Sequence, residues 1–337
     1  MSLVKTRNLA RQFQTHCAVA PGKRLRKATL RPSYQGMDAS TTASKPGAAS
    51  RLPADARIGR VRLRVGDLGR ALELYRDVLG LGVARDEGAR VTLAPPGSPG
   101  DRELVILEEQ PGISRRPARP VSTGLYHVAL LLPSRRDLGR TLTRLHQSGY
   151  PLRGMSDHAV SESLYLDDPD GNGLEIYTDR PRASWPVEGG VVQMTVDPMD
   201  VERVIAAGRE RAEPWTGLPA DTVIGHVHFT VSRMERAVAF YRDVIGFDVM
   251  MRIPSLTAVS AGGYHHHLNL NTWAGEGAPA DSDRVAGLLG WELVVPDSAA
   301  RRALIGRLGA AGALTGPAAA ATASDPDRIP IELEPVS

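Results

Sequence analysis

The stretch IGRVRLRVGDLGRALELYRDVLGL, from Ile58 to Leu81, decides the fold because the chain contains it twice. The second copy, IGHVHFTVSRMERAVAFYRDVIGF, runs from Ile224 to Phe247 and matches the first at 11 of 24 positions. Internal similarity of this length is typical of a fold that is assembled from copies of one structural unit. We therefore expect the whole chain to be built from such units.

Each copy predicts a strand followed by a helix. In the first copy Val61, Leu63 and Val65 alternate with arginines, and this period of two is typical of a half-buried strand. Asp67 is a favourable residue for the N-cap of the helix that follows, and Gly80 suits its end. Short alternating strands come next in the sequence. The pattern predicts an α+β fold made of βαβββ modules.

A weaker copy follows each strong one and ends in a related turn. The two turns read DPDGNGLEI at 168–176 and DPDRIPIEL at 325–333, and Asp-Pro-Asp is typical of a turn between strands. One βαβββ unit cannot bury both faces of its small sheet, so modules should pair into two curved eight-stranded cups. We predict four modules, at about 58–112, 123–180, 222–275 and 285–335.

The chain divides at a linker that contains Pro and Trp, 181–221. We predict a first domain at 58–180 and a second at 222–337, each with two modules. A basic leader, 1–57, precedes them and is predicted to be disordered, since its first 36 residues hold eight Lys or Arg and no acid. Removing these eight charges from the formal net charge of +3 leaves −5, which gives no electrostatic reason to expect nucleic acid.

The composition also bears on location. No apolar run reaches the roughly 18 residues that a membrane span requires. Cys17 is the only cysteine and belongs to the leader, so the modules contain neither a disulfide nor a thiol nucleophile. This cysteine usage is typical of a reducing cytoplasm, which we predict as the location. The sequence leaves open whether the protein forms a homo-oligomer.

The repeated strand–helix stretch and DPDGNGLEI resemble the vicinal oxygen chelate superfamily over nearly all of 58–335. That superfamily includes glyoxalase I, bleomycin resistance proteins and the extradiol ring-cleaving dioxygenases. A sharper motif has the spacing of the extradiol dioxygenase signature and departs from it at Ser156, where the family has Gly or a small apolar residue. Its positions are His158, Leu164, Tyr165, Asp168, Pro169, Gly171 and Glu175. The two module pairs and YHHHLNLNTW at 264–273 resemble two-domain catechol 2,3-dioxygenases.

This resemblance implies metal ligands on the first and last strands of paired modules. Two histidines and one glutamate would hold Fe(II), with Mn(II) or another divalent metal as options, and would leave positions for substrate and O₂. Pairing the modules in sequential order fails, because Arg60 and Gly290 stand where each pair needs a second histidine. Nested pairing of the second module with the third gathers His127, Glu175 and His226 in one cup.

The other cup would then hold Arg60, Gly290 and Glu332 without a metal, with a salt bridge between Arg60 and Glu332. Two further ligand sets stay open. One adds His267 to the first cup as a fourth ligand, in the style of glyoxalase. The other joins His226, His267 and Glu332 in the C-terminal pair of modules.

The resemblance also implies catalytic roles for His267, His158 and Tyr165. Within the tract of three histidines we choose His267 as the acid–base residue and His265 as runner-up, because strand alternation puts His266 on the opposite face. The predicted function is extradiol ring cleavage of a catechol-type substrate with O₂. The alternatives are a glyoxalase-type lyase or isomerase and a non-catalytic small-molecule-binding protein. The last class uses aromatic walls, which 5% aromatic residues fit poorly.

Overall fold

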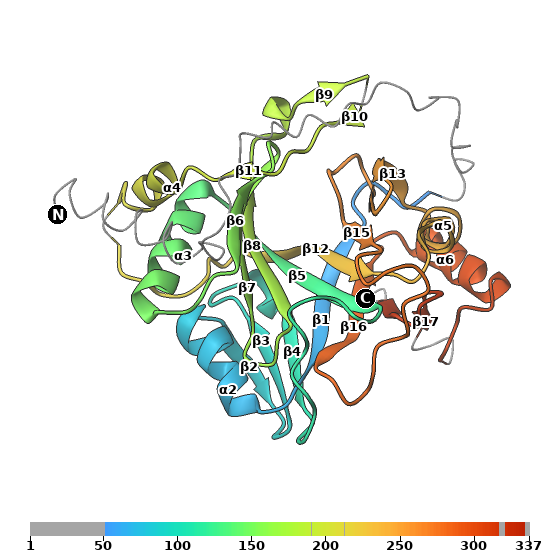
Figure 1. Ribbon diagram of the computed structural model, residues 1–337, viewed down its shortest axis with the longest axis horizontal. Helices are drawn as coiled ribbons and strands as arrows, with labels where there is room; N and C mark the ends of the chain where they lie inside the picture. The colour runs from blue at the N-terminus through green and yellow to red at the C-terminus, as the bar shows by residue number, and fades with distance from the viewer. Residues whose placement is uncertain (1–50, 190, 212, 317–320, 334–337) are drawn as a thin grey trace, which may run out of the picture.

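The computed structural model describes residues 51–189, 191–211, 213–316 and 321–333. Most of the predicted leader, Cys17 included, lies outside these residues. Two curved sheets with helices packed against them make up the described chain, which confirms the α+β fold class (Figure 1). Within the described part, no helix is long and apolar enough to cross a bilayer.

The first sheet joins the first module to the fourth. Its strands are β1 (Arg57–Val65), β2 (Gly82–Asp86), β3 (Arg90–Ala94), β4 (Val105–Glu109), β16 (Gly287–Val294), β17 (Thr322–Ser324) and β18 (Pro330–Leu333). They lie in the order β17-β18-β16-β1-β4-β3-β2. At its centre β1 and β16, the first strands of the two modules, run antiparallel.

The second sheet joins the second module to the third. Its strands are β5 (Gly124–Leu132), β6 (Gly154–Asp157), β7 (Ser161–Asp167), β8 (Gly173–Asp179), β11 (Asp197–Pro198), β12 (Val223–Thr230), β13 (Asp248–Ile253), β14 (Leu256–Ser260) and β15 (Leu268–Asn271). Their order is β11-β6-β7-β8-β5-β12-β15-β14-β13, with β5 and β12 antiparallel at the centre. The two sheets meet where β1 contacts β12 (Figure 1).

This strand order confirms the nested pairing of modules. The sheets have seven and nine strands where eight each were expected. The linker adds the two-residue strand β11 to the second sheet, and the described part of the fourth module contributes only β16, β17 and β18 to the first. The domain boundaries 58–180 and 222–337 stay a prediction about the sequence, since each sheet takes one module from either part.

The helices begin and end close to the predicted residues. Asp67 caps the first helix by accepting a hydrogen bond from the backbone N–H of Arg70 at 2.9 Å, and Gly80 follows it with φ of 75°. In both strong copies the second half of the helix is a π-helical turn. The helical segments are α2 (Leu68–Leu72), η2 (Glu73–Val78), η3 (Pro99–Asp101), α3 (Arg135–Ser148), η4 (Arg182–Ser184), α4 (Val201–Gly208), α5 (Met234–Ala239), η5 (Phe240–Ile245) and α6 (Ser298–Ala310). The linker also forms the short pair β9 (Val187–Glu188) and β10 (Val191–Val192).

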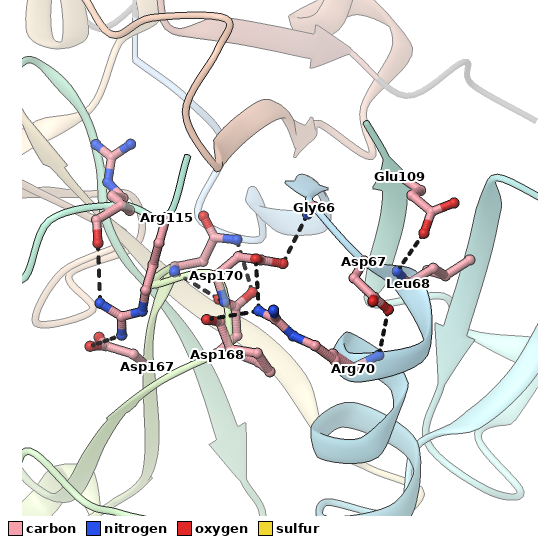
Figure 2. Close-up of polar contacts among 12 residues, drawn as sticks. Gly66, Asp67, Leu68, Arg70, Glu109, Arg115, Asp167, Asp168 and Asp170 are labelled. Carbon is pink, nitrogen blue, oxygen red and sulfur yellow. Dashed lines mark hydrogen bonds and ion pairs between the residues drawn. The ribbon is translucent and has the colours of Figure 1, made fainter. Parts of the chain in front are cut away.

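The π-helical turns aim a tyrosine at the Asp-Pro-Asp turn of the following module. The hydroxyl of Tyr75 donates to the carboxylate of Asp168 at 3.3 Å, and that of Tyr241 donates to Asp325 at 3.0 Å. Figure 2 shows the turn around Asp168, where Asp170 also accepts from Gly66 N and from the Arg70 guanidinium. These contacts join the first module to the second and the third to the fourth, whereas the sheets join the first to the fourth and the second to the third. The four modules therefore form a closed ring.

The buried aspartates of these turns should make stability depend on pH. Burial raises the pKa of Asp168 to about 6 and that of Asp325 to about 7. An acid whose folded pKa is raised binds its proton more tightly in the folded state. Its contribution to stability is therefore present below its unfolded pKa of about 4 and is lost as the pH rises through its folded pKa.

We expect Asp325→Asn to flatten this dependence, because the amide stays neutral at every pH. Between about pH 5 and pH 8 the thermal midpoint of this variant should fall less than that of the unchanged protein. Thermal unfolding followed by circular dichroism measures this, with the exposed Asp55→Asn as the matched control. Equal pH slopes for the Asp325→Asn variant and the unchanged protein would show that Asp325 does not titrate as described.

Candidate metal centre

Three buried side chains converge on neighbouring strands of the second sheet. His127 lies on β5, Glu175 on β8 and His226 on β12, and β5 lies between the other two strands. The Nε2 atoms of His127 and His226 are 3.3 Å apart. Oε2 of Glu175 lies 3.0 Å from the first of these nitrogens and 3.1 Å from the second. Residues that are 99 positions apart in the sequence therefore face one point inside the sheet's curve.

A glycine lets β8 come close enough to β5 for this convergence. A Cβ added to Gly173 would lie 2.2 Å from the carbonyl oxygen of Tyr126 and 3.1 Å from Cβ of His127. No residue with a side chain fits that space. The glycine before Leu174 in the DPDGNGLEI turn therefore sets the position of Glu175 beside His127.

The electrostatics of the cluster fit a cation. Burial raises the pKa of the Glu175 carboxyl, but His226 and His127 lower it, and the result is well below its usual range. Burial also lowers the pKa of His226, which favours the neutral imidazole. Two imidazole nitrogens and one carboxylate oxygen are the donor set that first-row divalent metals accept. The three side chains are thus suited to hold such an ion, and a buried carboxylate gains from one.

The two other predicted ligand sets are not assembled. Nδ1 of His267 is 2.8 Å from Oγ of Ser260 and accepts from the N–H of Ala261 at 3.2 Å, so this ring does not point its Nδ1 at the cluster. Glu332 lies in the first sheet, where it forms an ion pair with Arg62. Among the described residues, the three that could share one ion are His127, Glu175 and His226.

The corresponding place in the first sheet is filled by ion pairs. The expected salt bridge between Arg60 and Glu332 is wrong. Arg62 takes the place of Arg60 in it, because Arg62 and not Arg60 lies opposite Gly290 in the β1–β16 register. Arg62 contacts Glu332, while Arg60 contacts Glu292 at 3.3 Å. A Cβ added to Gly290 would lie 2.5 Å from Oε1 of Glu332. Arginine cations occupy the space that a metal would need.

Two of the predicted catalytic residues lie beside the cluster. Tyr165 is paired with Glu175 across β7 and β8, and its ring centroid is 5.7 Å from that of His127. Nδ1 of His158 is 2.7 Å from the carbonyl oxygen of Thr195, which fixes the proton on Nδ1 and leaves Nε2 to accept from the Tyr165 hydroxyl at 2.7 Å. Burial and the charge of Glu175 raise the pKa of Tyr165 well above its usual value.

The sequence missed the histidine that lies nearest to the cluster. The ring centroid of His266 is 4.1 Å from that of His226, and Nε2 of His266 is buried with no hydrogen-bond partner in the described chain. Strand alternation does not hold here, because Gly262 and Gly263 form a turn with positive φ and β15 begins only at Leu268. The histidines before that strand follow an irregular backbone, and it is His266, not His267, whose ring packs against His226.

A chain of hydrogen bonds fixes the protonation pattern of His266. Asp179 accepts from Nε2 of His265 at 2.8 Å, so Nδ1 of His265 is the atom without a proton. That Nδ1 lies 2.7 Å from Nδ1 of His266, which therefore donates. Burial lowers the pKa of His266 well below its usual range. In this tautomer Nε2 carries no proton, and it has no hydrogen-bond partner in the described chain.

The chain is similar to known proteins. The family model of the Glyoxalase/Bleomycin resistance protein/Dioxygenase superfamily matches residues 57–176 and 223–301. The chain belongs to this superfamily. Over 247 residues it is 46% identical to a catechol-2,3-dioxygenase of Bacillus subtilis (strain 168). The matched region covers 72% of this chain and 84% of that protein.

Further relatives agree with this membership. Biphenyl-2,3-diol 1,2-dioxygenase 3 of Rhodococcus globerulus is 31% identical over 36% of this chain and 63% of its own length. By these relationships the protein is an extradiol dioxygenase-like oxidoreductase. The fold is shared with glyoxalase I of Zea mays, with a TM-score of 0.50 at 17% identity over 82% of this chain and 92% of that one. A candidate dioxygenase from Bacillus subtilis subsp. subtilis str. 168 gives a TM-score of 0.56 at 13% identity, over 84% of this chain and 85% of the other.

Proposed function

We propose that the protein is an Fe(II)-dependent extradiol dioxygenase that cleaves the ring of a catechol-type substrate with O₂. The observation that carries this proposal is the convergence of His127, Glu175 and His226 on one point, with no fourth ligand beside them in the described chain. Two histidines and one carboxylate on one face of an ion leave other positions free, as O₂ chemistry with an organic substrate requires. The catechol-2,3-dioxygenase relative supports the same reaction class.

The proposed reaction balances without a further oxidant. One carbon–carbon bond next to a catechol hydroxyl breaks, and both atoms of O₂ enter the product as an aldehyde or ketone oxygen and a carboxylic acid oxygen. Bound Fe(II) would supply the redox chemistry and the binding positions for the substrate oxygens. The protein's part is to hold, orient and protonate, and these tasks fall to the residues around the cluster.

His266 is the proposed acid–base residue. Its Nε2 carries no proton and has no hydrogen-bond partner in the described chain, and its ring packs against that of His226, so it can accept the proton of a catechol hydroxyl and later return it to the product. The hydrogen bonds from His266 through His265 to Asp179 keep the ring in this tautomer and orientation. They also place a carboxylate where it stabilises the positive charge that His266 gains.

Tyr165 and His158 are proposed to bind the substrate on the other side of the cluster. The Tyr165 hydroxyl keeps its proton because its pKa is raised, and it is directed by the fixed acceptor Nε2 of His158. By turning this single proton from Nε2 of His158 to the substrate, the hydroxyl can hydrogen-bond an oxygen on which negative charge develops. Mn(II) in place of iron, a cytoplasmic location and a homo-oligomer stay predictions.

Turnover of catechols tests the proposal. The protein, loaded anaerobically with Fe(II) and then exposed to air, should convert catechol or a substituted catechol to a yellow ring-opened product, with one O₂ consumed for each molecule formed. Absorbance and an oxygen electrode measure the two quantities together. A glyoxalase-type enzyme would instead isomerise its substrate without O₂, so the absence of oxygen uptake over a panel of catechols would overturn the proposal.

A further inference from the structure

A cavity of about 640 Å³ lies between the two sheets. Its walls come from the start of β1, the end of β16, the start of β12, the end of β5 and the residues Tyr264 and His267. His127, Glu175 and His226 do not line it. Volumes of this size are typical of sites for small molecules. The cavity is therefore separate from the metal cluster, and the proposed function assigns it no role.

Positive charge exceeds negative charge in the lining. The charged lining residues are Arg57, Arg60, Arg85, Arg102, Glu103 and Glu292. Glu103 contacts both Arg60, at 2.5 Å, and Arg85. Arg57 and Arg102 form no ion pair with any other described residue, so their guanidinium groups are available. Two such donors beside one cavity favour a bound anion, because guanidinium binds carboxylate in a planar, two-point geometry.

His267 adds a neutral donor to these two arginines. Its Nδ1 accepts the N–H of Ala261 at 3.2 Å, which places the ring proton on Nε2. The residue is only 9% exposed, yet it lines the cavity, and Nε2–H is the polar group that its ring has left to offer. A donor that lines a cavity and has no protein partner can bind a ligand that accepts its hydrogen bond.

The rest of the wall is apolar and selects an organic anion. Ile58, Leu131 and Ile224 line the cavity together with the charged groups. We propose that the cavity binds a small organic carboxylate, with its anionic group at Arg57, Arg102 and Nε2–H of His267 and its apolar part against these three side chains. Inorganic anions would leave the apolar wall uncovered. This site does not depend on the proposed oxygenase function.

Binding of 4-bromobenzoate to the full-length, metal-loaded protein tests the site. Calorimetry should show binding of this carboxylate and none of the uncharged 4-bromobenzamide at the same concentrations. The double variant Arg57→Gln/Arg102→Gln should bind the carboxylate about tenfold more weakly or worse, since two charge-assisted contacts are lost. Arg119→Gln/Arg233→Gln removes two exposed arginines away from the cavity and should bind it unchanged.

The place of binding is tested separately, because a carboxylate could also ligate the metal. Anomalous diffraction from the bromine in crystals with 4-bromobenzoate should give a peak in the cavity lined by Arg57 and His267. A peak only at His127 and His226, equal affinity for the amide, or unchanged affinity in the Arg57→Gln/Arg102→Gln variant would each overturn the proposal. Failure of the oxygenase proposal would leave these readouts unaffected.

Discussion

His127→Ala and His226→Ala should each abolish metal binding and ring cleavage. Either change leaves two of the three proposed protein ligands, so metal content after desalting should fall to background. Turnover should fall about a thousandfold or more, because the proposed redox chemistry depends on the bound metal and the described residues offer no second site for it. The two histidines come from different halves of the sequence, and equal losses for both are expected only if the second and third modules share one site.

His228→Ala is the matched control for this experiment. It removes a histidine two residues further along the same strand, whose Nε2 accepts from the Asn271 amide at 2.9 Å and is not in the cluster. Metal content should stay near that of the unchanged protein. Metal analysis by mass spectrometry checks all three variants, and full metal occupancy in His127→Ala would contradict the shared site.

His266→Phe should lower kcat by about 10²–10⁴-fold, the usual contribution of a positioned general base, while the metal stays bound. Phenylalanine keeps the ring that packs against His226 but has no nitrogen to take a proton. Steady-state kinetics of catechol turnover together with metal analysis separate this loss from a loss of iron. The result tests the tautomer assignment as well, since only an unprotonated Nε2 can act as the base.

The comparison variant is His267→Phe, which changes the histidine that the sequence favoured. Its loss of kcat should be at least about tenfold smaller than that of His266→Phe, because Nδ1 of His267 is already engaged by Ala261 and Ser260. If His267→Phe instead loses as much activity as His266→Phe or more, the sequence-based choice of His267 is the correct one.

The fold could be predicted from the sequence because the modules repeat. Period-two strands, together with the Asp67 cap and Gly80 in the first module, are local signals that depend on neighbouring residues alone. The nested pairing followed from chemistry, since arginine and glycine at Arg60 and Gly290 cannot complete a ligand set. What could not be predicted was the partner of Arg60, because it depends on the exact register of β1 against β16.

The site was predictable where ligands lie on regular strands and not where the backbone is irregular. His127, Glu175 and His226 lie within β5, β8 and β12, at the strand positions that the family resemblance implies. The histidine tract before β15 follows a turn at Gly262 and Gly263, where the backbone is not extended, so side chains are not expected to alternate between the two faces there. The contact of His265 with Asp179 joins the third module to the second, and no local sequence pattern predicts such a long-range contact.

Anomalous diffraction at the iron absorption edge tests the central claim most directly. Crystals of the protein reconstituted anaerobically with Fe(II) should give one strong peak within about 2.0–2.3 Å of Nε2 of His127, Nε2 of His226 and a carboxylate oxygen of Glu175. A peak that lies elsewhere, or iron that occupies the first sheet beside Glu332, would contradict the account of a single site shared by the second and third modules.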